Sequence, residues 1–337
     1  VVNRELKELN EAHSGDLVVF TKLNDVFTGE CLSTKDGYGQ QAEMEFPKPQ
    51  MLVAIEALNK NDEDKISTGI QRLREEDPSF TYNRNKETKQ MVLGVQGEIH
   101  VNAIKDKLKE KFGVEVAIKD LKVPYRETIK GTSDVQGKHK KQSGGHGQYG
   151  DVKIKFSPSS EPFEFAEEIF GGSVPKSYIP AVEKGLRDCL EHGVLAGYPV
   201  TNIKATLYDG SYHDVDSSEM AFKMAASLAF KKGIEEAKPV LLEPVMKLSI
   251  YVPEEYMGDI MGDINKKRGR VLGMEPFKSH KQVIYAEAPQ SETFKYAIDL
   301  KAMTQGRGYF EMEFVRYEEV PAQLAEKIIA EAKAEKQ

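Results

Sequence analysis

The sequence predicts an α+β protein of several domains, in which two split βαβ units flank a longer α+β segment. The order β-α-β-β-α-β can be read between residues 51 and 118 and again between residues 246 and 317. The chain has 337 residues, which is too long for one small hydrophobic core. Prolines mark the edges and turns of the middle segment, at positions 124, 175, 180, 199 and 239.

The first βαβ unit is predicted from hydrophobic periodicity. Ile66, Ile70 and Leu73 recur at the spacing of one helix face, and Asp77-Pro78 ends that helix. The elements of this unit are expected at 51–55, 62–76, 80–82, 90–95, 98–111 and 114–118. The second helix is expected to turn three residues toward the core: Ile99, Ile104 and Leu108.

The second βαβ unit repeats this order near the end of the chain. Its elements are expected at 246–252, 254–267, 270–274, 282–288, 291–303 and 309–317. In the last strand, Phe310, Met312 and Phe314 alternate with charged residues and are expected to face inward.

The middle segment has strand patterns at 126–130, 149–156 and 202–208, and helix patterns near 178–192 and 217–236. Asp216 and Glu219 stand three apart before the second helix, which is the spacing of a capping box, so Asp216 is expected to cap it. Residues 1–46 contain strand patterns at 17–20 and 27–32 that are typical of the end of a β-barrel, although two strands alone cannot bury a core. The chain starts with Val1 rather than Met, which suggests a piece of a longer protein.

Composition narrows the function classes. The net charge of −7 argues against a protein coated with basic residues, so any contact with nucleic acid should be local. The two cysteines lie far apart, and free thiols in a reducing cytoplasm are expected rather than a disulfide. Since no apolar run approaches the length of a bilayer span, no membrane association is expected.

The short sequence motifs that resemble nucleotide-binding sites do not stand in the structural context that such sites require. Gly145–Gly150 spells G-x-G-x-x-G, but a strand pattern follows it where a dinucleotide-binding loop needs a helix. The segment 131–138 has the wrong glycine spacing for a P-loop, and Asn59-Lys-Asn-Asp62 is better explained as a polar turn and helix cap. We therefore expect no catalytic residue, no cofactor site and no metal site in this chain.

What remains is a glycine-rich hairpin that is cationic where it starts. Lysine attracts phosphates, glutamine, histidine and tyrosine can hydrogen-bond and stack, and glycine permits close backbone approach. A mobile, solvated hairpin would explain the same residues. The candidate RNA-contacting residues here and in the loop after 210 are Lys138, His139, Lys140, Lys141, Ser143, Gly144, Gly145, His146, Gly147, Gln148, Tyr149, Tyr212, His213 and Asp214.

Longer strings resemble translation elongation factor G, from the end of its second domain to its C-terminus. The strings that carry the resemblance are Glu76-Asp-Pro-Ser-Phe80, Gly97-Glu-Ile-His100, Pro124-Tyr-Arg-Glu-Thr128, Gly137-Lys-His-Lys-Lys-Gln-Ser-Gly-Gly145, Leu195-Ala-Gly-Tyr-Pro199, Gly210-Ser-Tyr-His-Asp-Val-Asp-Ser-Ser-Glu-Met-Ala-Phe222 and Gly258-Asp-Ile-Met-Gly-Asp-Ile-Asn265 with Arg268-Gly269. The match extends over essentially all 337 residues, and strings of this length in this order are highly specific.

The resemblance implies a domain plan. The plan has two ferredoxin-like split βαβ domains flanking an elongated domain like ribosomal protein S5, after the remnant of a translation-factor β-barrel. The implied boundaries are 1–46 for the barrel part, 47–122 for the third domain, 123–241 for the fourth, 242–320 for the fifth and 321–337 for a C-terminal helix or tail. The fourth domain would carry two tip loops, 138–150 and 210–217, which together are called the tip below.

The resemblance also implies a function. The chain would be the ribosome-binding arm of a ribosome-dependent GTPase that promotes tRNA–mRNA translocation, with the tip in the A site of the decoding centre. Its partners would be both ribosomal subunits, tRNA and mRNA, and an upstream GTP-binding domain that would hold GTP and Mg²⁺. A cytoplasmic monomer is expected. The alternatives are a ribosome-protection factor of the tetracycline-resistance type and a stand-alone RNA-binding module.

One departure from the family pattern carries a prediction. The first tip loop usually has Arg where this chain has His146, so a fixed cation becomes a group that is mostly neutral at physiological pH. We expect weaker electrostatic attachment of this loop and a translocation rate that depends more on pH. Translocation by the wild type and by His146→Arg should be compared between about pH 6 and 8; parallel profiles would contradict the prediction.

Overall fold

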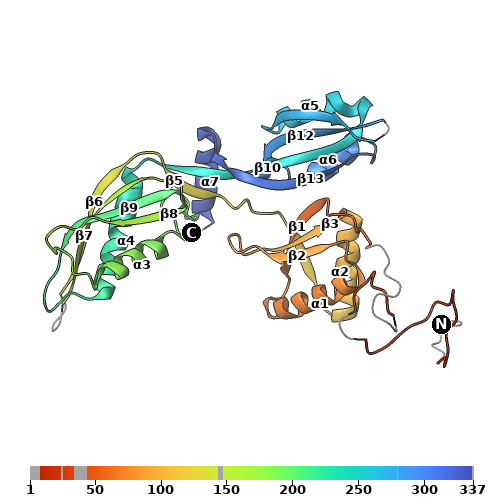
Figure 1. Cartoon of the computed structure of the whole chain (residues 1–337), viewed down its shortest axis with the longest axis horizontal. Coiled ribbons are helices and arrows are strands. Elements are labelled where there is room, and N and C mark those ends of the chain that lie inside the picture. Colours follow the sequence, from red (N-terminus) through yellow and green to blue (C-terminus); the bar gives the residue numbers. More distant parts are fainter. Residues whose placement is uncertain (1–7, 24–25, 34–43, 143–146, 279, 336–337) are drawn as a thin grey trace. The chain divides into compact units, whose positions relative to one another are not determined.

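The computed structural model describes residues 8–23, 26–33, 44–142, 147–278 and 280–335. Within these ranges the chain is a mixed α+β protein with three sheets, as the sequence predicts (Figure 1). The strand orders are β2-β3-β1-β4, β6-β7-β9-β8 and β11-β12-β10-β13, with β5 paired to β10 outside the last path.

The first sheet and its helices follow the split βαβ order. The strands are β1 (Met51–Ala57), β2 (Thr81–Arg84), β3 (Met91–Val95) and β4 (Val116–Lys119), and the helices are α1 (Glu63–Glu76) and α2 (Glu98–Phe112). Ile66, Ile70 and Leu73 are buried, as their spacing predicts. Asn59 caps the turn before α1 by accepting from the N–H of Asn61.

The prediction that Ile99 faces the core is wrong. Ile99 is 87% exposed, whereas Val101, Ile104 and Leu108 are buried. The reason is helix geometry: Ile99 and Leu108 are nine residues apart, which places them on opposite faces of a helix with 3.6 residues per turn.

The barrel strands predicted at 17–20 and 27–32 are not formed. In the described ranges 8–23 and 26–33, no residue belongs to a helix or strand, and Leu17 is 98% exposed. Two strands without a further sheet to pack on cannot bury their apolar residues, which explains the difference.

The middle sheet carries helices on one face. Its strands are β6 (Ser133–Lys141), β7 (Gln148–Pro158), β8 (Phe163–Glu167) and β9 (Ile203–Ser211), and its helices are α3 (Ile179–Cys189) and α4 (Glu219–Glu236). Val152, Ile154 and Phe156 of β7 point into a core shared with α3 and α4, as the alternation predicts. The strand residues between them, such as Lys153 and Lys155, turn to the opposite, polar face.

Two strands of this sheet were not predicted. The cationic segment 137–142, interpreted from the sequence as a loop, belongs largely to β6, which pairs antiparallel with β7. The exposed residues Asp134, Gln136 and Lys138 alternate with the buried Val135 and Gly137, and the small glycine weakens the apolar signal that would identify a strand. The short strand β8, parallel to β9, was also missed.

A long strand, β10 (Pro239–Pro253), pairs with β5 (Arg126–Ile129) and then forms the centre of the third sheet. The other elements are β11 (Arg270–Pro276), β12 (Lys281–Pro289), β13 (Tyr309–Glu319), α5 (Met257–Lys266), α6 (Tyr296–Met303) and the C-terminal helix α7 (Ala322–Ala334). Both α5 and α6 start later than predicted because a 3-10 turn precedes each. Phe310 is buried as predicted, but Phe314 is 55% exposed: it lies beside the β-bulge at Val245/Met246 of β10 and outside the core cluster.

Glu127 of β5 holds a loop of the middle segment in place. Its side chain is fully buried, and its two carboxylate oxygens accept from the backbone N–H groups of Leu195, Ala196, Gly197 and Tyr198 at 2.9 to 3.1 Å. Four charge-assisted hydrogen bonds satisfy the buried carboxylate and fix the loop that precedes β9.

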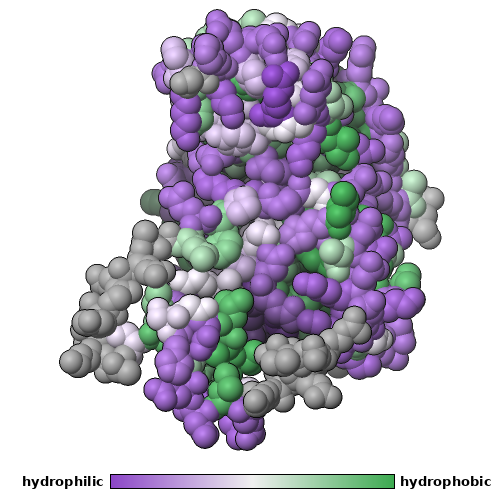
Figure 2. All heavy atoms as spheres, turned by 90° about the vertical axis from the view of Figure 1, so that its right-hand side faces the viewer, coloured by the Kyte–Doolittle hydropathy of each residue, from purple (hydrophilic) through white to green (hydrophobic). Residues whose placement is uncertain are grey.

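The surface is mostly polar. Hydrophilic residues predominate on the face shown in Figure 2, and hydrophobic residues form separate groups there. Across the described ranges, none of the helices combines the length and apolarity that a bilayer span requires.

Candidate nucleic-acid interface

The cationic hairpin is built on β6 and β7. Lys141 lies opposite Gln148, and Lys140 lies opposite Tyr149, so the register places the positive end of β6 beside the first tip loop. Lys138, Lys140 and Lys141 are exposed. They provide a local positive charge on a chain whose net charge is negative, which suits attraction to phosphates.

Two glycines of the hairpin, Gly137 and Gly150, allow close packing against helix α4. A Cβ atom at Gly137 would lie 2.1 Å from the carbonyl oxygen of Ala225, and one at Gly150 would lie 2.5 Å from that of Ala221. Only glycine therefore lets β6 and β7 approach the backbone of α4 this closely. Gly150, the last residue of the G-x-G-x-x-G pattern, sits in a strand that packs on the side of a helix, so the structure gives no support to dinucleotide binding.

Asp216 joins the two tip loops. The N–H of Gly147 donates to Asp216 Oδ1 at 2.9 Å, and the N–H of Tyr149 donates to the Asp216 carbonyl oxygen at 2.8 Å. Ser217 Oγ in turn donates to the carbonyl oxygen of Tyr149 at 3.0 Å. These bonds bring together residues that are 67 to 69 positions apart in sequence, so the two loops lie at the same end of the sheet.

The predicted cap of α4 is wrong. Ser218, not Asp216, is the N-cap, because its hydroxyl accepts from the N–H of Ala221 at 3.2 Å. The helix begins at Glu219, which places Asp216 too far upstream to reach its first N–H groups. The carboxylate of Asp216 is thereby available for Gly147.

Gln148 and His213 lie in neighbouring parts of the tip, and both are exposed. Gln148 Oε1 lies 2.9 Å from His139 Nε2 on the adjacent strand. His213 Nδ1 accepts from the N–H groups of Val215 at 3.3 Å and Asp216 at 3.2 Å. The ring of His213 is 6.3 Å, centroid to centroid, from that of Tyr149, the residue after Gln148.

The hydroxyl of Tyr149 belongs to a network of polar side chains that includes Ser211 and Asp151. Its hydroxyl hydrogen-bonds Ser211 Oγ at 2.7 Å, and Ser211 Oγ donates to the buried carboxylate of Asp151 at 2.8 Å. Gln136 also donates to Asp151, and Lys138 Nζ lies 3.9 Å from it. These contacts fix the tyrosine ring, over which Lys138 also lies at 5.5 Å.

On the polar face of the sheet, Lys153 of β7 pairs with Asp209 of β9 at 2.8 Å. The hydrogen bond from Lys153 lowers the pKa of Asp209 to about 2, and donation to Asp134 raises the pKa of the Tyr208 hydroxyl to about 12. The Asp209 carboxylate is thus ionised at neutral pH and offsets the charge of Lys153. At the end of β6, by contrast, Lys138, Lys140 and Lys141 are exposed and supply positive charge that could attract RNA.

The structure places the predicted site residues as follows. Ser143, Gly144, Gly145 and His146 lie outside the described residues. Tyr212 and Asp214 are exposed in the second tip loop, beside His213. Sequence reasoning missed the joining role of Asp216 and the support from Ser211 and Ser217, because hydrogen bonds across more than 60 residues leave no local pattern.

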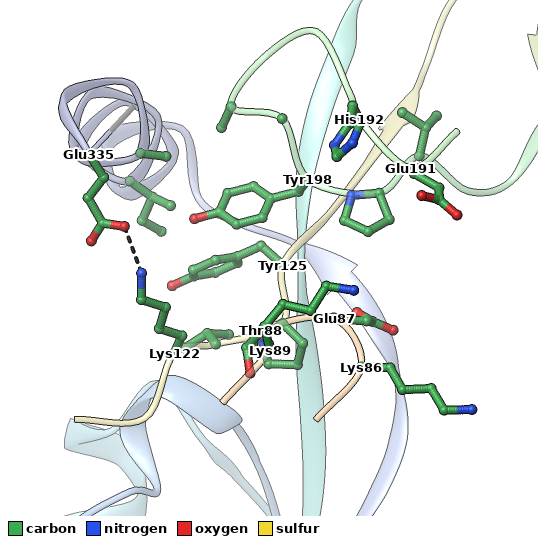
Figure 3. A pocket seen from close by; sticks show the side chains of 18 of the residues that line it. Lys86, Glu87, Thr88, Lys89, Lys122, Tyr125, Glu191, His192, Tyr198 and Glu335 are labelled. Carbon is green, nitrogen blue, oxygen red and sulfur yellow. Dashed lines mark hydrogen bonds and ion pairs between the residues drawn. The ribbon is translucent and has the colours of Figure 1, made fainter. Parts of the chain in front are cut away.

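A separate hollow of about 780 Å³ lies near α7 (Figure 3). Tyr125 and Tyr198 stand next to each other there, with ring centroids 5.4 Å apart, and point their hydroxyls to the side where Lys122 pairs with Glu335. Burial raises the pKa of Tyr125 to about 12 and also raises that of Tyr198. Since neither phenol ionises near neutral pH, the pair offers apolar and hydrogen-bonding surface rather than charge.

Three family models match the chain in the order of its sheets. Elongation factor G domain III matches residues 46–120, elongation factor G domain IV matches residues 121–238, and the elongation factor G C-terminus matches residues 240–328. The chain belongs to the elongation factor G family. The tip therefore lies in domain IV of the family, and α5 and α6 lie in its C-terminal domain.

A solved structure agrees with this assignment. A protein from Thermus thermophilus with a solved crystal structure has 44% sequence identity to this elongation factor G-family chain. The two structures superpose with a TM-score of 0.78. The match covers 88% of this chain and 45% of the other, so the chain spans less than half the length of that protein.

Proposed function

We propose that this chain is the ribosome-contacting arm of an elongation factor G-type translocation factor, and that its tip enters the A site of the decoding centre. The observation that supports the proposal best is the junction of the two tip loops through Asp216, at the end of the sheet where β6 is cationic. Exposed groups that can hydrogen-bond and stack beside lysines suit contact with single-stranded or loop RNA.

The proposed work of the arm is mechanical. In the full-length protein, an upstream domain would bind GTP and Mg²⁺, and hydrolysis would change the favoured orientation of the domains described here. The tip can bias tRNA and mRNA movement only if it binds the states before and after translocation unequally. The protein would act as a monomer on both ribosomal subunits in the cytoplasm.

The test is His213→Ala in the full-length protein. Loss of one hydrogen bond to RNA should slow translocation about tenfold, while ribosome-stimulated GTP turnover stays near normal. Rates are measured by rapid mixing with labelled mRNA. The matched control is His192→Ala, an exposed histidine of the same domain away from the tip, which should have no effect. Equal slowing by both variants, or no slowing by either, would contradict the proposal.

A further inference from the structure

Strand β3 is flanked by a glutamine at each end, Gln90 before it and Gln96 after it. The chain enters the first sheet through the entry segment, 47–50, and leaves it through the exit segment, 120–123. Both segments lie outside helices and strands, so the regular hydrogen bonds of those elements do not hold them. The side-chain amides of the two glutamines bind to these segments instead.

The amide of Gln90 binds the exit segment through both of its ends. Nε2 donates to the carbonyl oxygen of Asp120 at 2.9 Å, and Oε1 accepts from the N–H of Lys122 at 2.8 Å. Turning the amide over would set donor against donor and acceptor against acceptor, so only one orientation makes both bonds. The exit segment is thereby fixed to the start of β3.

The amide of Gln96 binds the entry segment through its donors. Nε2 lies 3.0 Å from the carbonyl oxygen of Pro47, 3.2 Å from that of Lys48 and 3.0 Å from that of Ser79. Two N–H groups therefore serve three acceptors, and one of them is shared. Because Pro47 and Pro49 have fixed φ angles, the entry segment has few free torsions, and one side chain is enough to hold it.

A closed ring of hydrogen bonds orients Gln96. Its backbone N–H donates to His100 Nδ1 at 3.3 Å, and His100 Nε2 lies 3.1 Å from Asp77 Oδ2. Since Nδ1 accepts, Nε2 carries the proton of the neutral imidazole and donates it to Asp77. Asp77 Oδ1 accepts from the N–H of Ser79 at 2.9 Å, and the carbonyl of Ser79 accepts from Gln96. The ring joins the end of α1 to the start of α2 and fixes the side chain that holds the entry segment.

We infer that Gln90 and Gln96 are two clasps that fix the exit and entry segments to strand β3, so that the hinges at either end of this domain lie before Pro47 and after Lys122. Hinge residues absorb large changes of φ and ψ, which the clasped residues cannot do while the amides hold them. That such hinges serve the reorientation of domains rests on the proposed function. The clasps themselves do not.

The first test is NMR relaxation of the backbone amides in the complete chain, without ribosomes. Gln96→Met keeps an unbranched side chain but removes its donors, so the order parameter of Lys48 should fall from about 0.85 to below about 0.6, with Lys122 unchanged. Gln90→Met should have the converse effect. Gln71→Met, the same exchange at an exposed position of α1, is the control and should change neither. Unchanged order in the two clasp variants, or equal loss at both segments, would overturn the inference.

The second test restores or divides the bonds of each clasp. Gln96→Lys retains donors for the same carbonyl oxygens, so Lys48 should regain its order. Gln90→Glu keeps the acceptor for the N–H of Lys122 but loses the donor to Asp120. The Lys122 amide should therefore exchange with solvent at close to the wild-type rate in Gln90→Glu and about tenfold faster in Gln90→Met. Equal exchange in these two variants, or no rescue by Gln96→Lys, would show that other contacts hold the segments.

The third test separates the clasps from the proposed function. In the full-length protein, Gln96→Met and Gln90→Met should slow translocation about fivefold, because the loosened segments yield when the domains reorient, while ribosome-stimulated GTP turnover stays near normal. If Lys48 loses order in Gln96→Met but translocation keeps its wild-type rate, the role of the clasps in translocation is overturned. A wild-type rate for His213→Ala would count against the proposed function instead, since that side chain belongs to the tip and to neither clasp.

Discussion

Glu127→Gln should destabilise the middle domain by about 3–5 kcal/mol. The carboxylate is fully buried and accepts from four backbone N–H groups at residues 195–198. An amide would replace one oxygen by an NH₂ group that cannot accept, which leaves buried N–H donors facing another donor. The loss is large because unsatisfied buried groups keep their full desolvation cost.

The loss of stability is measured by urea denaturation, and native-state hydrogen exchange of the amides at 195–198 shows whether it arises at the loop. Those amides should exchange orders of magnitude faster than in wild type. Glu164→Gln is the matched control, because Glu164 is a partly exposed carboxylate 4.0 Å from Lys204 and should change stability by less than about 1 kcal/mol. Similar, small effects of both variants would show that the four hydrogen bonds do not hold the loop.

Gly137→Ala should cost about 3 kcal/mol, at the upper end of overpacking effects. The added methyl carbon would lie 2.1 Å from the carbonyl oxygen of Ala225 and 2.6 Å from the nitrogen of Ala229. Both are helix backbone atoms that cannot rotate away, so β6 or α4 must shift. Because β6 leads into the first tip loop, the shift should also weaken the bonds between Asp216 and the Gly147–Tyr149 backbone.

The measurement for Gly137→Ala is thermal unfolding combined with the translocation assay. The control is Gly262→Ala: Gly262 lies inside α5, and beyond the adjacent helix backbone no atom lies within 4 Å of an added Cβ. There alanine should be neutral or stabilise by up to about 1 kcal/mol, since alanine is the better helix former. A Gly137→Ala protein as stable as Gly262→Ala would contradict the close approach of β6 to α4.

The sequence predicts the βαβ units well because they depend on periodicity. Ile66, Ile70 and Leu73 share a helix face, and Val152, Ile154 and Phe156 share a strand face. The predictions fail where no period is present. β6 was missed because glycine takes an inward position, and the barrel strands predicted in 1–46 find no sheet to pack on in the described chain.

In the tip, too, some features could be predicted from the sequence and others could not. The hairpin and the histidine-bearing bend could be found from residue types, and the structure brings Tyr149 and Asp216 into direct contact. The partners of Gln148 and His213 could not be predicted. One lies on a neighbouring strand and the other is backbone, and neither leaves a residue pattern in the sequence. Contact of these residues with RNA remains a prediction.

Site-specific photocrosslinking tests the central claim most directly. A benzophenone amino acid is placed at position 148, 213 or 235 of the full-length protein bound to ribosomes before and after translocation. Position 235 is exposed near the far end of α4, an 18-residue helix roughly 27 Å long. Positions 148 and 213 should crosslink to the same RNA region at the decoding centre, and position 235 should not. Crosslinks from 148 and 213 to distant regions, or to no RNA, would contradict a single RNA-contacting tip.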